Sequence, residues 1–301
     1  MSTISNRKIG VVFWFAFLGL FMSPAVRPAE IALSLHGDYC SAISVKVSGE
    51  IRKGDASRLK SVIDRLDSYA KRTFGGCFFP PTVWLDSAGG DVEESLKLGQ
   101  VIRIARLGTR VGYRAKCFSA CIFVLAGGVQ RDSSGRNEIA IHRPYFSDIA
   151  EGRPIEEIRI ARADLIKRIR HYLENMEISP ALIDAMIAIP PNEMRLLEEA
   201  DLQTFRLIGE DPSYEEYRVN RMAKLFSLRT ADYRQRHTSA WEECEKTYAG
   251  DTNVCVNARI LRIDIAEAQA RRERLQSCRR STKNEIVQGE CFRKYMTRGE
   301  K

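Results

Sequence analysis

The segment Thr82-Val83-Trp84-Leu85-Asp86-Ser87-Ala88-Gly89-Gly90-Asp91 decides the fold class. Its apolar start predicts a strand over 82–85, and the glycine pair permits a tight turn towards a helix. Upstream, apolar and polar residues alternate over 43–49, which predicts another strand. Asp55 can cap a helix over 56–73 between the two strands. This order of strand, helix and strand predicts a right-handed crossover and a parallel sheet.

The same alternation of elements continues downstream. Further strands are expected over 110–114, 138–141 and 207–208, and helices over 92–105, 120–126, 156–175 and 196–205. Another helix should start at Ser179-Pro180, because serine caps a helix and proline suits its first turn. The fold class predicted for residues 31–210 is therefore α/β.

The composition changes after Asp211-Pro212, where the chain becomes charged and helical in pattern. Helices are expected over 241–246 and 256–276, with a turn at Gly250-Asp251. We expect residues 214–301 to form a small helical second domain. The alternative is a carboxy-terminal arm that packs on the first domain or on a neighbouring subunit.

The amino terminus has the pattern of an export signal. Arg7 and Lys8 precede an uncharged apolar run over 9–22, and small residues surround Ala25. We expect residues 1–25 to be a signal peptide cleaved after Ala25, with Ala29 as the second choice, and the mature protein to be periplasmic. The alternative is an uncleaved membrane anchor at the amino terminus.

The chain has eight cysteines, and in an exported protein an even number favours disulfides. They are Cys40, Cys77, Cys117, Cys121, Cys244, Cys255, Cys278 and Cys291. We expect Cys40 to pair with Cys77, since both precede strands taken as neighbours. In the second domain either the local pairs Cys244–Cys255 and Cys278–Cys291 form, or Cys244 bonds Cys291. Cys117 and Cys121 either bond to each other or leave a free thiol that acts as a nucleophile. The spacing of the cysteines predicts no metal site.

The net charge of +8 spreads over helices that also carry acidic residues. A solvated basic surface therefore explains the charge better than nucleic-acid binding. The sequence contains no Gly-x-x-x-x-Gly-Lys phosphate loop, and we expect no cofactor.

Three segments carry residue types that acyl-transfer chemistry needs. Ser119 lies between two cysteines before an apolar helix, and His142 follows a predicted strand. Histidine is the usual base for a serine nucleophile because its pKa lies near neutrality. The backbone amides of Gly90 and Ala120 are candidates for an oxyanion hole. Each residue alone also has a structural explanation: a helix cap for Ser119, a strand-end histidine for His142 and a turn for the glycines.

The three segments resemble motifs of the proteolytic subunit of the Clp protease (ClpP) and its relatives in the crotonase superfamily. Asp86-Ser87-Ala88-Gly89-Gly90 is similar to the family's Asn-Ser-Pro-Gly-Gly, and Ile141-His142-Arg143-Pro144 to its Ile-His-Gln-Pro. Ser119-Ala120 at the start of an apolar helix is the third likeness. The resemblance covers about 43–209 and implies a ClpP/crotonase-like core of stacked β-β-α units in a spiral. The cysteines around Ser119, the export signal and the terminal extension look more like a group of periplasmic Clp-protease-like proteins.

The resemblance implies that Ser119 is the nucleophile, His142 the base, and Gly90 and Ala120 the oxyanion donors. The family's aspartate has no match in the corresponding segment, where Asn192 or Glu193 could orient the imidazole. Asp148 is a remoter candidate. The family also implies a homo-oligomer.

We therefore expect an exported serine hydrolase, in the first place a peptidase acting on peptides or on protein segments near the membrane. The alternative is a catalytically impaired binding or assembly protein on the same scaffold. A crotonase-type acyl-thioester enzyme is a third hypothesis, which would leave Ser119 and His142 without a role.

Overall fold

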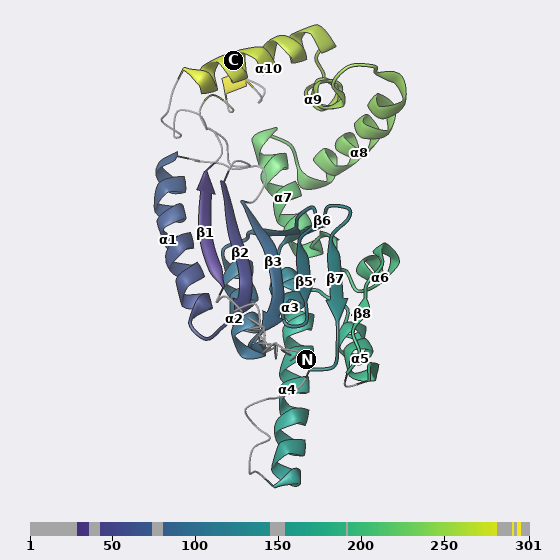
Figure 1. Cartoon of the computed structure of the whole chain (residues 1–301). Coiled ribbons are helices and arrows are strands. Elements are labelled where there is room, and N and C mark those ends of the chain that lie inside the picture. Colours follow the sequence, from purple (N-terminus) through teal and green to yellow (C-terminus); the bar gives the residue numbers. More distant parts are fainter. Residues whose placement is uncertain are drawn as a thin grey trace, which may run out of the picture.

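The computed structural model describes residues 29–35, 43–73, 81–144, 154–190, 192–281, 291 and 294–295. The expected signal peptide, 1–25, and the pair Cys40 and Cys77 lie outside these residues. The described chain forms a mixed α/β structure in which one branched sheet carries helices and a helical carboxy-terminal part follows (Figure 1).

The sheet has nine strands in the described part of the chain. They are β1 Glu30–Leu35, β2 Ile43–Ile51, β3 Thr82–Gly90, β4 Gly108–Val111, β5 Lys116–Phe118, β6 Gln130–Ser133, β7 Glu138–Ile141, β8 Arg195–Leu196 and β9 Gly209–Glu210. Strands β2, β3, β4, β5, β6 and β7 pair in parallel, as the crossover pattern predicts, and β1, β8 and β9 join antiparallel at the edges.

Strand β3 is the branch point of the sheet. It pairs with β2 along one edge, from Thr82 to Gly90. Along the other edge it pairs with β4 up to Leu85 and then with β5 at Ser87. The sheet therefore divides into two arms beyond Leu85, one through β4, β6 and β9 and the other through β5, β7 and β8.

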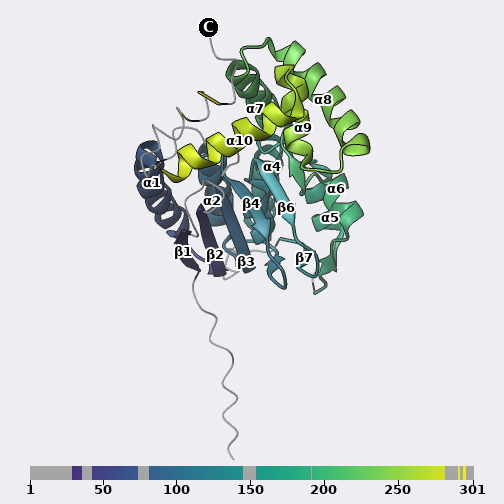
Figure 2. The same ribbon diagram turned by 90° about the horizontal axis from the view of Figure 1, so that it is seen from above.

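Ten helices occur among the described residues. They are α1 Asp55–Thr73, α2 Val92–Ile104, α3 Cys121–Ala126, α4 Ile155–Asn175, α5 Ala181–Ala188, α6 Glu199–Thr204, α7 Pro212–Leu225, α8 Thr230–Thr247, α9 Thr252–Leu261 and α10 Ile265–Arg280. Helices α2 and α4 lie on the same face of the sheet in both views (Figures 1 and 2). Every residue of α3 is buried, so this short helix forms the centre of the packing between sheet and helices.

A hydrogen bond ties helices together at the centre of the core. The hydroxyl of Tyr172 on α4 donates to the backbone oxygen of Phe123 on α3 (2.5 Å). Burial raises the pKa of Tyr172 far above its ordinary value, so the group remains a neutral donor. Gly99 on α2 leaves room for this contact, because a Cβ there would lie 1.7 Å from the Tyr172 hydroxyl.

The buried apolar side chains fall into one large and several small clusters. The large cluster runs from Val45 to Leu207 and holds the sheet together with α1 to α6. A second cluster, from Val219 to Leu261, joins α7, α8 and α9 and contains Cys244 and Cys255. We propose that the two clusters mark two domains divided near residues 211–214.

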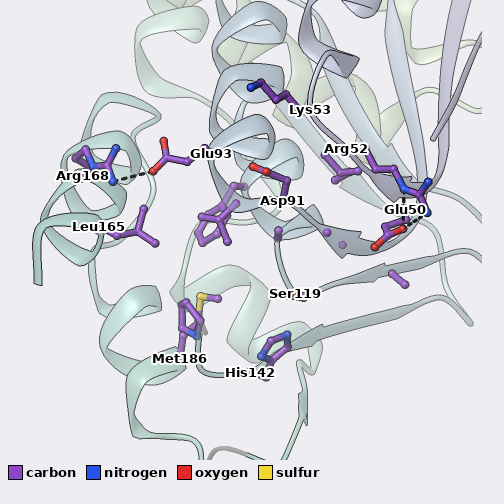
Figure 3. A pocket seen from close by; sticks show the side chains of 18 of the residues that line it. Glu50, Arg52, Lys53, Asp91, Glu93, Ser119, His142, Leu165, Arg168 and Met186 are labelled. Atoms are coloured by element: carbon purple, nitrogen blue, oxygen red, sulfur yellow. Dashed lines mark hydrogen bonds and ion pairs between the residues drawn. The ribbon is translucent and has the colours of Figure 1, made fainter. Parts of the chain in front are cut away.

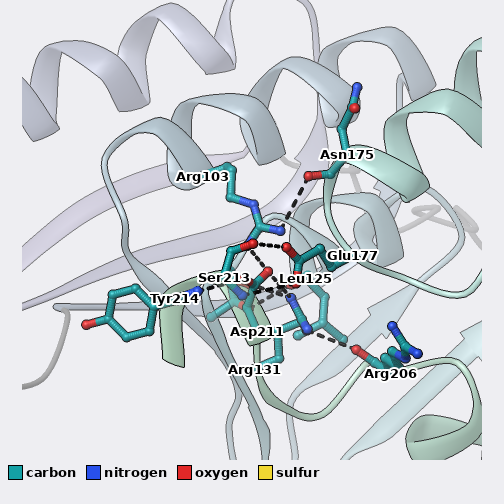
Figure 4. Close-up of polar contacts among 11 residues, drawn as sticks. Arg103, Leu125, Arg131, Asn175, Glu177, Arg206, Asp211, Ser213 and Tyr214 are labelled. Carbon is teal, nitrogen blue, oxygen red and sulfur yellow. Dashed lines mark hydrogen bonds and ion pairs between the residues drawn. The ribbon is translucent and has the colours of Figure 1, made fainter. Parts of the chain in front are cut away.

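A buried ion pair joins the start of α7 to α2 and β6 (Figure 4). Asp211 begins α7 by accepting a hydrogen bond from the backbone nitrogen of Tyr214 (3.0 Å). Its other carboxylate oxygen contacts Arg103 of α2 and lies 3.8 Å from Arg131 of β6. Asp211 and Arg131 are almost fully buried, and burial lowers the pKa of Arg131 to about 10. Arg131 also donates to the backbone oxygen of Gly128 (2.7 Å), so its charge is satisfied by an anion and by dipoles.

The local pairing of the carboxy-terminal cysteines is confirmed. Cys244 bonds Cys255 across the turn between α8 and α9, and Cys278 bonds Cys291. The nested alternative, Cys244 with Cys291, is therefore wrong. The local bonds join residues only 11 and 13 positions apart, so each closes a short loop.

Some predicted elements differ from the structure. The single helix expected over 256–276 is wrong, because Arg262 adopts a left-handed conformation (φ 57°) that ends α9 and α10 begins three residues later. The strand expected over 110–114 starts earlier, at Gly108, and the strand expected over 207–208 forms at Gly209–Glu210. The helix expected over 196–205 starts later, at Glu199, because Arg195–Leu196 pairs with β7 as strand β8. Strands β1, β5, β6 and β8 were not predicted. In the described residues, no helix has the length and apolarity that crossing a bilayer requires.

Candidate functional site

The candidate site lies where four parallel strands end. Strands β2, β3, β5 and β7 run in the same direction, so their carboxyl ends lie along one edge of the sheet. The residues that follow these ends are Arg52 after β2, Asp91 after β3, Ser119 after β5 and His142 after β7. The parallel register therefore gathers residues that are up to 90 positions apart in the sequence, as is typical of ligand sites in α/β sheets.

Ser119 occupies a sharp turn between strand β5 and helix α3. Its φ is +54°, which is uncommon for any residue other than glycine. The backbone nitrogen of Ser119 donates to the oxygen of Ala140 on β7 (3.0 Å), and its oxygen accepts from Ile122 at the start of α3 (3.1 Å). A strained left-handed serine between a strand and a buried helix is the geometry of a nucleophile elbow.

A disulfide spans this elbow. Cys117 and Cys121 are bonded, with a Cα–Cα separation of 5.2 Å, and both residues are fully buried. The alternative in which one of these cysteines is a free thiol and attacks in place of Ser119 is therefore wrong. The bond leaves Ser119, midway between the two cysteines, as the nucleophile candidate at this turn.

The first of the two glycines at the end of β3 approaches the elbow closely. A Cβ at Gly89 would lie 2.7 Å from the oxygen of Phe118, 2.8 Å from the Cβ of Ser119 and 3.0 Å from the nitrogen of Ala120. A Cβ at Gly90 would instead lie 2.2 Å from the oxygen of Ile51 on β2. Both residues have positive φ values, 97° and 139°, so glycine at 89 lets β3 pass beside Ser119 and glycine at 90 lets it pass beside β2.

The two proposed oxyanion donors are backbone amides at the ends of elements. Gly90 ends β3 and Ala120 precedes the first residue of α3, and both residues line the cleft that contains Ser119. The amide of Asp91, the residue after Gly90, donates to Ile51 of β2 (2.9 Å). Ala120 is the other expected donor because the first amides of a helix have no partner within it.

His142 follows β7, the strand that pairs in parallel with β5. Phe118 pairs with Ala140 in the register, so Ser119 comes one position after that pair and His142 two positions after it. Nδ1 of His142 lies 2.8 Å from the backbone oxygen of Arg143. A carbonyl only accepts, so this contact places the proton on Nδ1 and makes Nε2 the basic nitrogen in the neutral ring.

Ser119 and His142 line the same cleft (Figure 3). The cleft has a volume of about 940 Å³ and is also lined by Gly89, Gly90 and Ala120. Its apolar walls come from α3, α4, α5 and the loop after it, and include Phe123, Leu165, Met186 and Met194. The structure thus brings four of the residues proposed from the sequence, Ser119, His142, Gly90 and Ala120, to one cavity with an apolar side.

The opposite rim of the cleft is charged. Arg168 on α4 pairs with Glu93 of α2 (2.8 Å) and with Asp164 (3.1 Å), as Figure 3 shows for Glu93. Asp91 accepts from the backbone nitrogen of Glu94 (2.8 Å) and so begins α2. Glu50, Arg52 and Lys53 also line the cleft, and Arg52 pairs with Glu50 (2.5 Å). The cleft therefore has one apolar and one charged side.

Two further candidates lie away from this cavity. Asn192 and Glu193 are exposed and are not among the residues that line the cleft. The backbone nitrogen of Glu193 donates to Pro190 in a local turn (3.1 Å). Asp148 lies outside the described residues. The group that meets Nδ1 of His142 in the described chain is instead the neighbouring Arg143 carbonyl.

Sequence reasoning did not find the apolar wall. Leu165 and Met186 belong to ordinary amphipathic patterns, and nothing in those patterns separates a cavity wall from a core. Ser87 was also missed: its hydroxyl donates to the backbone oxygen of Gly49 (2.5 Å) and accepts from the nitrogen of Gly89 (3.1 Å), which holds the glycine turn.

No group of three or more His, Cys, Asp or Glu side chains suited to a metal ion occurs within the described residues.

No protein-family model matches the chain, and no curated protein matches it. Among solved structures, a mutant of ClpP1 from Listeria monocytogenes is similar, with a TM-score of 0.42 and 18% sequence identity. The likeness covers 55% of this chain and 88% of that one.

Proposed function

We propose that the protein is an exported serine hydrolase that cleaves acyl bonds, in the first place those of peptides, through an acyl-enzyme on Ser119. The observation that carries the proposal is the elbow: a left-handed serine beside a glycine pair, in one cleft with a histidine whose Nδ1 meets a carbonyl. The order of the three sequence motifs supports a distant relation to the proteolytic subunit of the Clp protease and to a periplasmic group of such proteins.

The reaction follows from these groups. The Ser119 hydroxyl attacks the substrate carbonyl while Nε2 of His142 takes its proton, and the carbonyl oxygen becomes an oxyanion. The imidazolium then gives the proton to the leaving amine or alcohol, and an ester on Ser119 remains. Water, activated by the same nitrogen, attacks the ester and returns Ser119 to its starting state.

The amides of Gly90 and Ala120 are assigned to the oxyanion. Donors fixed by the backbone need no reorganisation when the negative charge develops, and in related chemistry the loss of one donor costs about 10²–10³ in rate. Gly89 permits the close approach that brings the two amides to one side of Ser119.

The Arg143 carbonyl is assigned the orienting role that an aspartate fills in serine triads. It holds the ring at Nδ1 and fixes the tautomer, but as a neutral group it stabilises the imidazolium less than a carboxylate would.

The apolar wall suggests the substrate class. Phe123, Leu165 and Met186 line the cleft together with Ser119, so an apolar side chain on the acyl side of the scissile bond would be buried there. The methionine side chains at 186 and 194 are adaptable and suit more than one apolar shape. Peptides or esters with a leucine-like or methionine-like acyl side are the proposed substrates.

Three broader points belong to the same proposal. The three disulfides are compatible with an oxidising compartment, and we propose the periplasm, reached through a signal at 1–25. We propose a homo-oligomer with peptide or protein substrates. We also propose the stacked β-β-α spiral for the main domain, supported by its repeated parallel pairings.

The test is covalent labelling with a fluorophosphonate probe. The full-length protein without its signal should be labelled, and Ser119→Ala should abolish labelling. His142→Ala should lower the labelling rate by about 10²–10⁴ because the hydroxyl loses its base. The matched control is Ser87→Ala, which removes a buried hydroxyl near the glycines but no proposed nucleophile and should retain labelling at a reduced rate. A folded wild-type protein that no fluorophosphonate labels would end the proposal.

The orienting group is tested by three further variants. Asn192→Ala and Glu193→Ala should keep the labelling rate within about twofold, since both side chains are exposed and away from the cleft. Loss of a triad carboxylate lowers kcat by about 10⁴. A comparable loss in Asp148→Ala would identify that carboxylate, rather than the Arg143 carbonyl, as the group behind the ring.

The second candidate is a binding protein that uses the same cleft without catalysis. The placement of Asn192 and Glu193 outside the cleft favours it, because neither can complete a triad there. Under this proposal an apolar peptide would bind to the wild type and to Ser119→Ala with equal affinity, and neither protein would cleave it.

A further inference from the structure

We propose that the Cys117–Cys121 disulfide is a positioning device for Ser119, which holds the serine in its left-handed conformation beside His142. The inference rests on the proposed function, because it concerns the geometry of the proposed nucleophile. It assigns this bond a role that the other two disulfides of the described chain do not have.

The two cysteines are anchored in different parts of the core. Cys117 is the middle residue of β5 and is paired on both sides, with Ser87 of β3 and with Ile139 of β7. Cys121 is the first residue of α3, the helix whose residues are all buried. The bond therefore joins the sheet directly to the central helix, and only three residues connect its ends through the backbone.

Those three residues have little freedom once the bond is closed. Ser119 is the middle one and carries the positive φ of 54°. For a residue with a Cβ this conformation is disfavoured by roughly a factor of ten relative to ordinary torsions. A chain free to relax would lower φ at Ser119 and turn its hydroxyl away from the cleft, so something must hold the turn.

Hydrogen bonds hold the turn only in part. Ser119 donates through its nitrogen to Ala140 (3.0 Å), and Ile122 and Phe123 donate to the oxygens of Ser119 and Ala120 (both 3.1 Å). The Ser119 oxygen belongs to the same planar peptide as the Ala120 amide, the proposed oxyanion donor, so one hydrogen bond already restrains that peptide. The covalent bond joins the two ends of the turn and adds a second restraint on nucleophile and donor together.

The loop lengths separate this bond from the others. Its cysteines are 4 residues apart, whereas those of the other two bonds are 11 and 13 residues apart. The stabilisation that a disulfide gives by restricting the unfolded chain rises with loop length. The bond around Ser119 thus contributes least to the stability of the whole chain, which suits it to setting local geometry.

The bond is also shielded. Both cysteines are 0% exposed, so a thiol reagent reaches the sulfurs only when the site opens. Positioning by this bond is therefore a permanent property of the folded protein.

The experiment compares two double variants of the full mature chain. Cys117→Ala/Cys121→Ala removes the bond at the elbow, and Cys244→Ala/Cys255→Ala removes an equally buried bond in the second cluster. Alanine leaves no unsatisfied polar atom in the core. The readouts are the fluorophosphonate labelling rate, kcat and KM for a nitrophenyl ester of a short apolar acyl chain, and the thermal midpoint.

The elbow variant should lose about tenfold or more in labelling rate and in kcat. Its KM should stay within about twofold and the pH midpoint of kcat should not move, because the groups remain and only their alignment changes. The control variant should keep kcat within about twofold although it lowers the thermal midpoint more. Equal losses of kcat in both variants, or none at the elbow, would overturn the proposal.

Hydrogen exchange separates this inference from the proposed function. If the wild type shows no labelling, the hydrolase is wrong, and exchange of the 116–123 segment still decides the role of the bond. Faster exchange of the Ser119 and Ile122 amides in the elbow variant, with the control unchanged there, supports positioning. Unchanged exchange at these amides would contradict it.

Discussion

At the scale of single residues, Gly89 is where the sheet comes closest to the proposed nucleophile. Its missing side chain leaves the space that the Phe118 oxygen and the Ser119 Cβ occupy. Serine chemistry at this point therefore depends on a residue that takes no part in the reaction. Its contribution is geometric, since it allows two backbone segments to lie in contact.

We predict that Gly89→Ala removes activity with a moderate loss of stability. The new Cβ would lie within 3.0 Å of three atoms of the elbow, and the alanine would have to adopt a φ of 97°. Such strain costs about 1–3 kcal/mol, and the shift of Ser119 should lower the labelling rate at least tenfold. Urea unfolding and fluorophosphonate labelling measure the two effects.

Gly209→Ala is the matched control. Gly209 has a similar φ of 105°, but a Cβ on this residue would have no other atom within 4 Å, so the variant carries the torsional strain without the contact. Its stability should fall by roughly 1 kcal/mol while labelling stays at the wild-type rate. Equal labelling losses in both variants would show that the close approach at Gly89 has no special role.

The sequence predicted which residues of the site meet but not what surrounds them. Ser119, His142, Gly90 and Ala120 could be proposed because serine, histidine and glycine pairs at element ends are rare and carry chemistry. The contact between His142 and the Arg143 carbonyl could not be predicted, because it depends on a backbone atom that every residue has. Asn192 and Glu193 were proposed by analogy of position, and both side chains are exposed, while their neighbour Met194 lines the cleft.

At the scale of elements, helix α8 presents a row of rings at four-residue spacing. Tyr233, His237 and Trp241 stack in sequence, with centroid distances of 5.5 and 6.1 Å, and Phe226, which follows α7, stacks on Tyr233 (5.7 Å). Burial lowers the pKa of His237, and the nearby Arg218 lowers it further. The imidazole is therefore held neutral within an aromatic row.

This row predicts a dependence of stability on pH. The pKa of His237 lies below its ordinary value of 6.5 in the folded state, so the unfolded chain binds more protons in acid. The free energy of unfolding should therefore fall as the pH drops from 6.5 through the lowered pKa, and the contribution is fully present above 6.5. His237→Phe keeps the stacking and should flatten this slope in urea unfolding at several pH values.

His171→Phe is the control for that series. His171 is exposed on α4, and its replacement should leave the acid slope as it is in the wild type. An unchanged slope in His237→Phe would mean that other groups cause the acid sensitivity.

Elements with an apolar pattern and a marked boundary could be predicted, and polar short strands could not. The helix over 56–73 and the strand over 138–141 match α1 and β7 closely. Strand β7 has only four residues, but three of them are apolar, whereas β6, also four residues long, is the polar sequence Gln-Arg-Asp-Ser, and β5 has three residues. The places of β5 and β6 in the sheet come from tertiary pairing with β3 and β4.

At the scale of the whole molecule, the ion pair of Asp211 with Arg131 holds the start of α7 on the sheet (Figure 4). We predict that Asp211→Asn destabilises the protein by about 3 kcal/mol or more, because the buried arginine charge loses its anion. The asparagine side chain can still accept the hydrogen bond from the Tyr214 nitrogen, so the helix cap remains and the loss of stability reflects the lost negative charge alone. Chemical denaturation with two probes, one for each cluster, measures the free energy of unfolding.

Glu216→Gln gives the comparison at the surface. Glu216 pairs with Arg234, and both side chains are about half exposed (51% and 50%). Exposed pairs contribute about 0–1 kcal/mol, so this variant should unfold almost as the wild type does. A small effect of Asp211→Asn, equal to that of Glu216→Gln, would show that the buried pair does not join the two clusters.

The division of the chain into two parts could be proposed from composition, but the buried ion pair at the boundary could not. The change after Asp211-Pro212 indicated where helices take over, and the second cluster of buried residues begins soon after, at Val219. Sequence patterns gave no sign that Asp211 itself would be buried against two arginines. Opposite charges from α2, β6 and the start of α7 meet only after the sheet has formed.

The short spans of the described disulfides also affect how the chain matures. Each bond closes within a single stretch of at most 14 consecutive residues, since the largest separation is 13. During synthesis each of these cysteines therefore meets its partner before any later cysteine has emerged. If the proposed export is right, the six thiols should pair early, before the rest of the chain has folded.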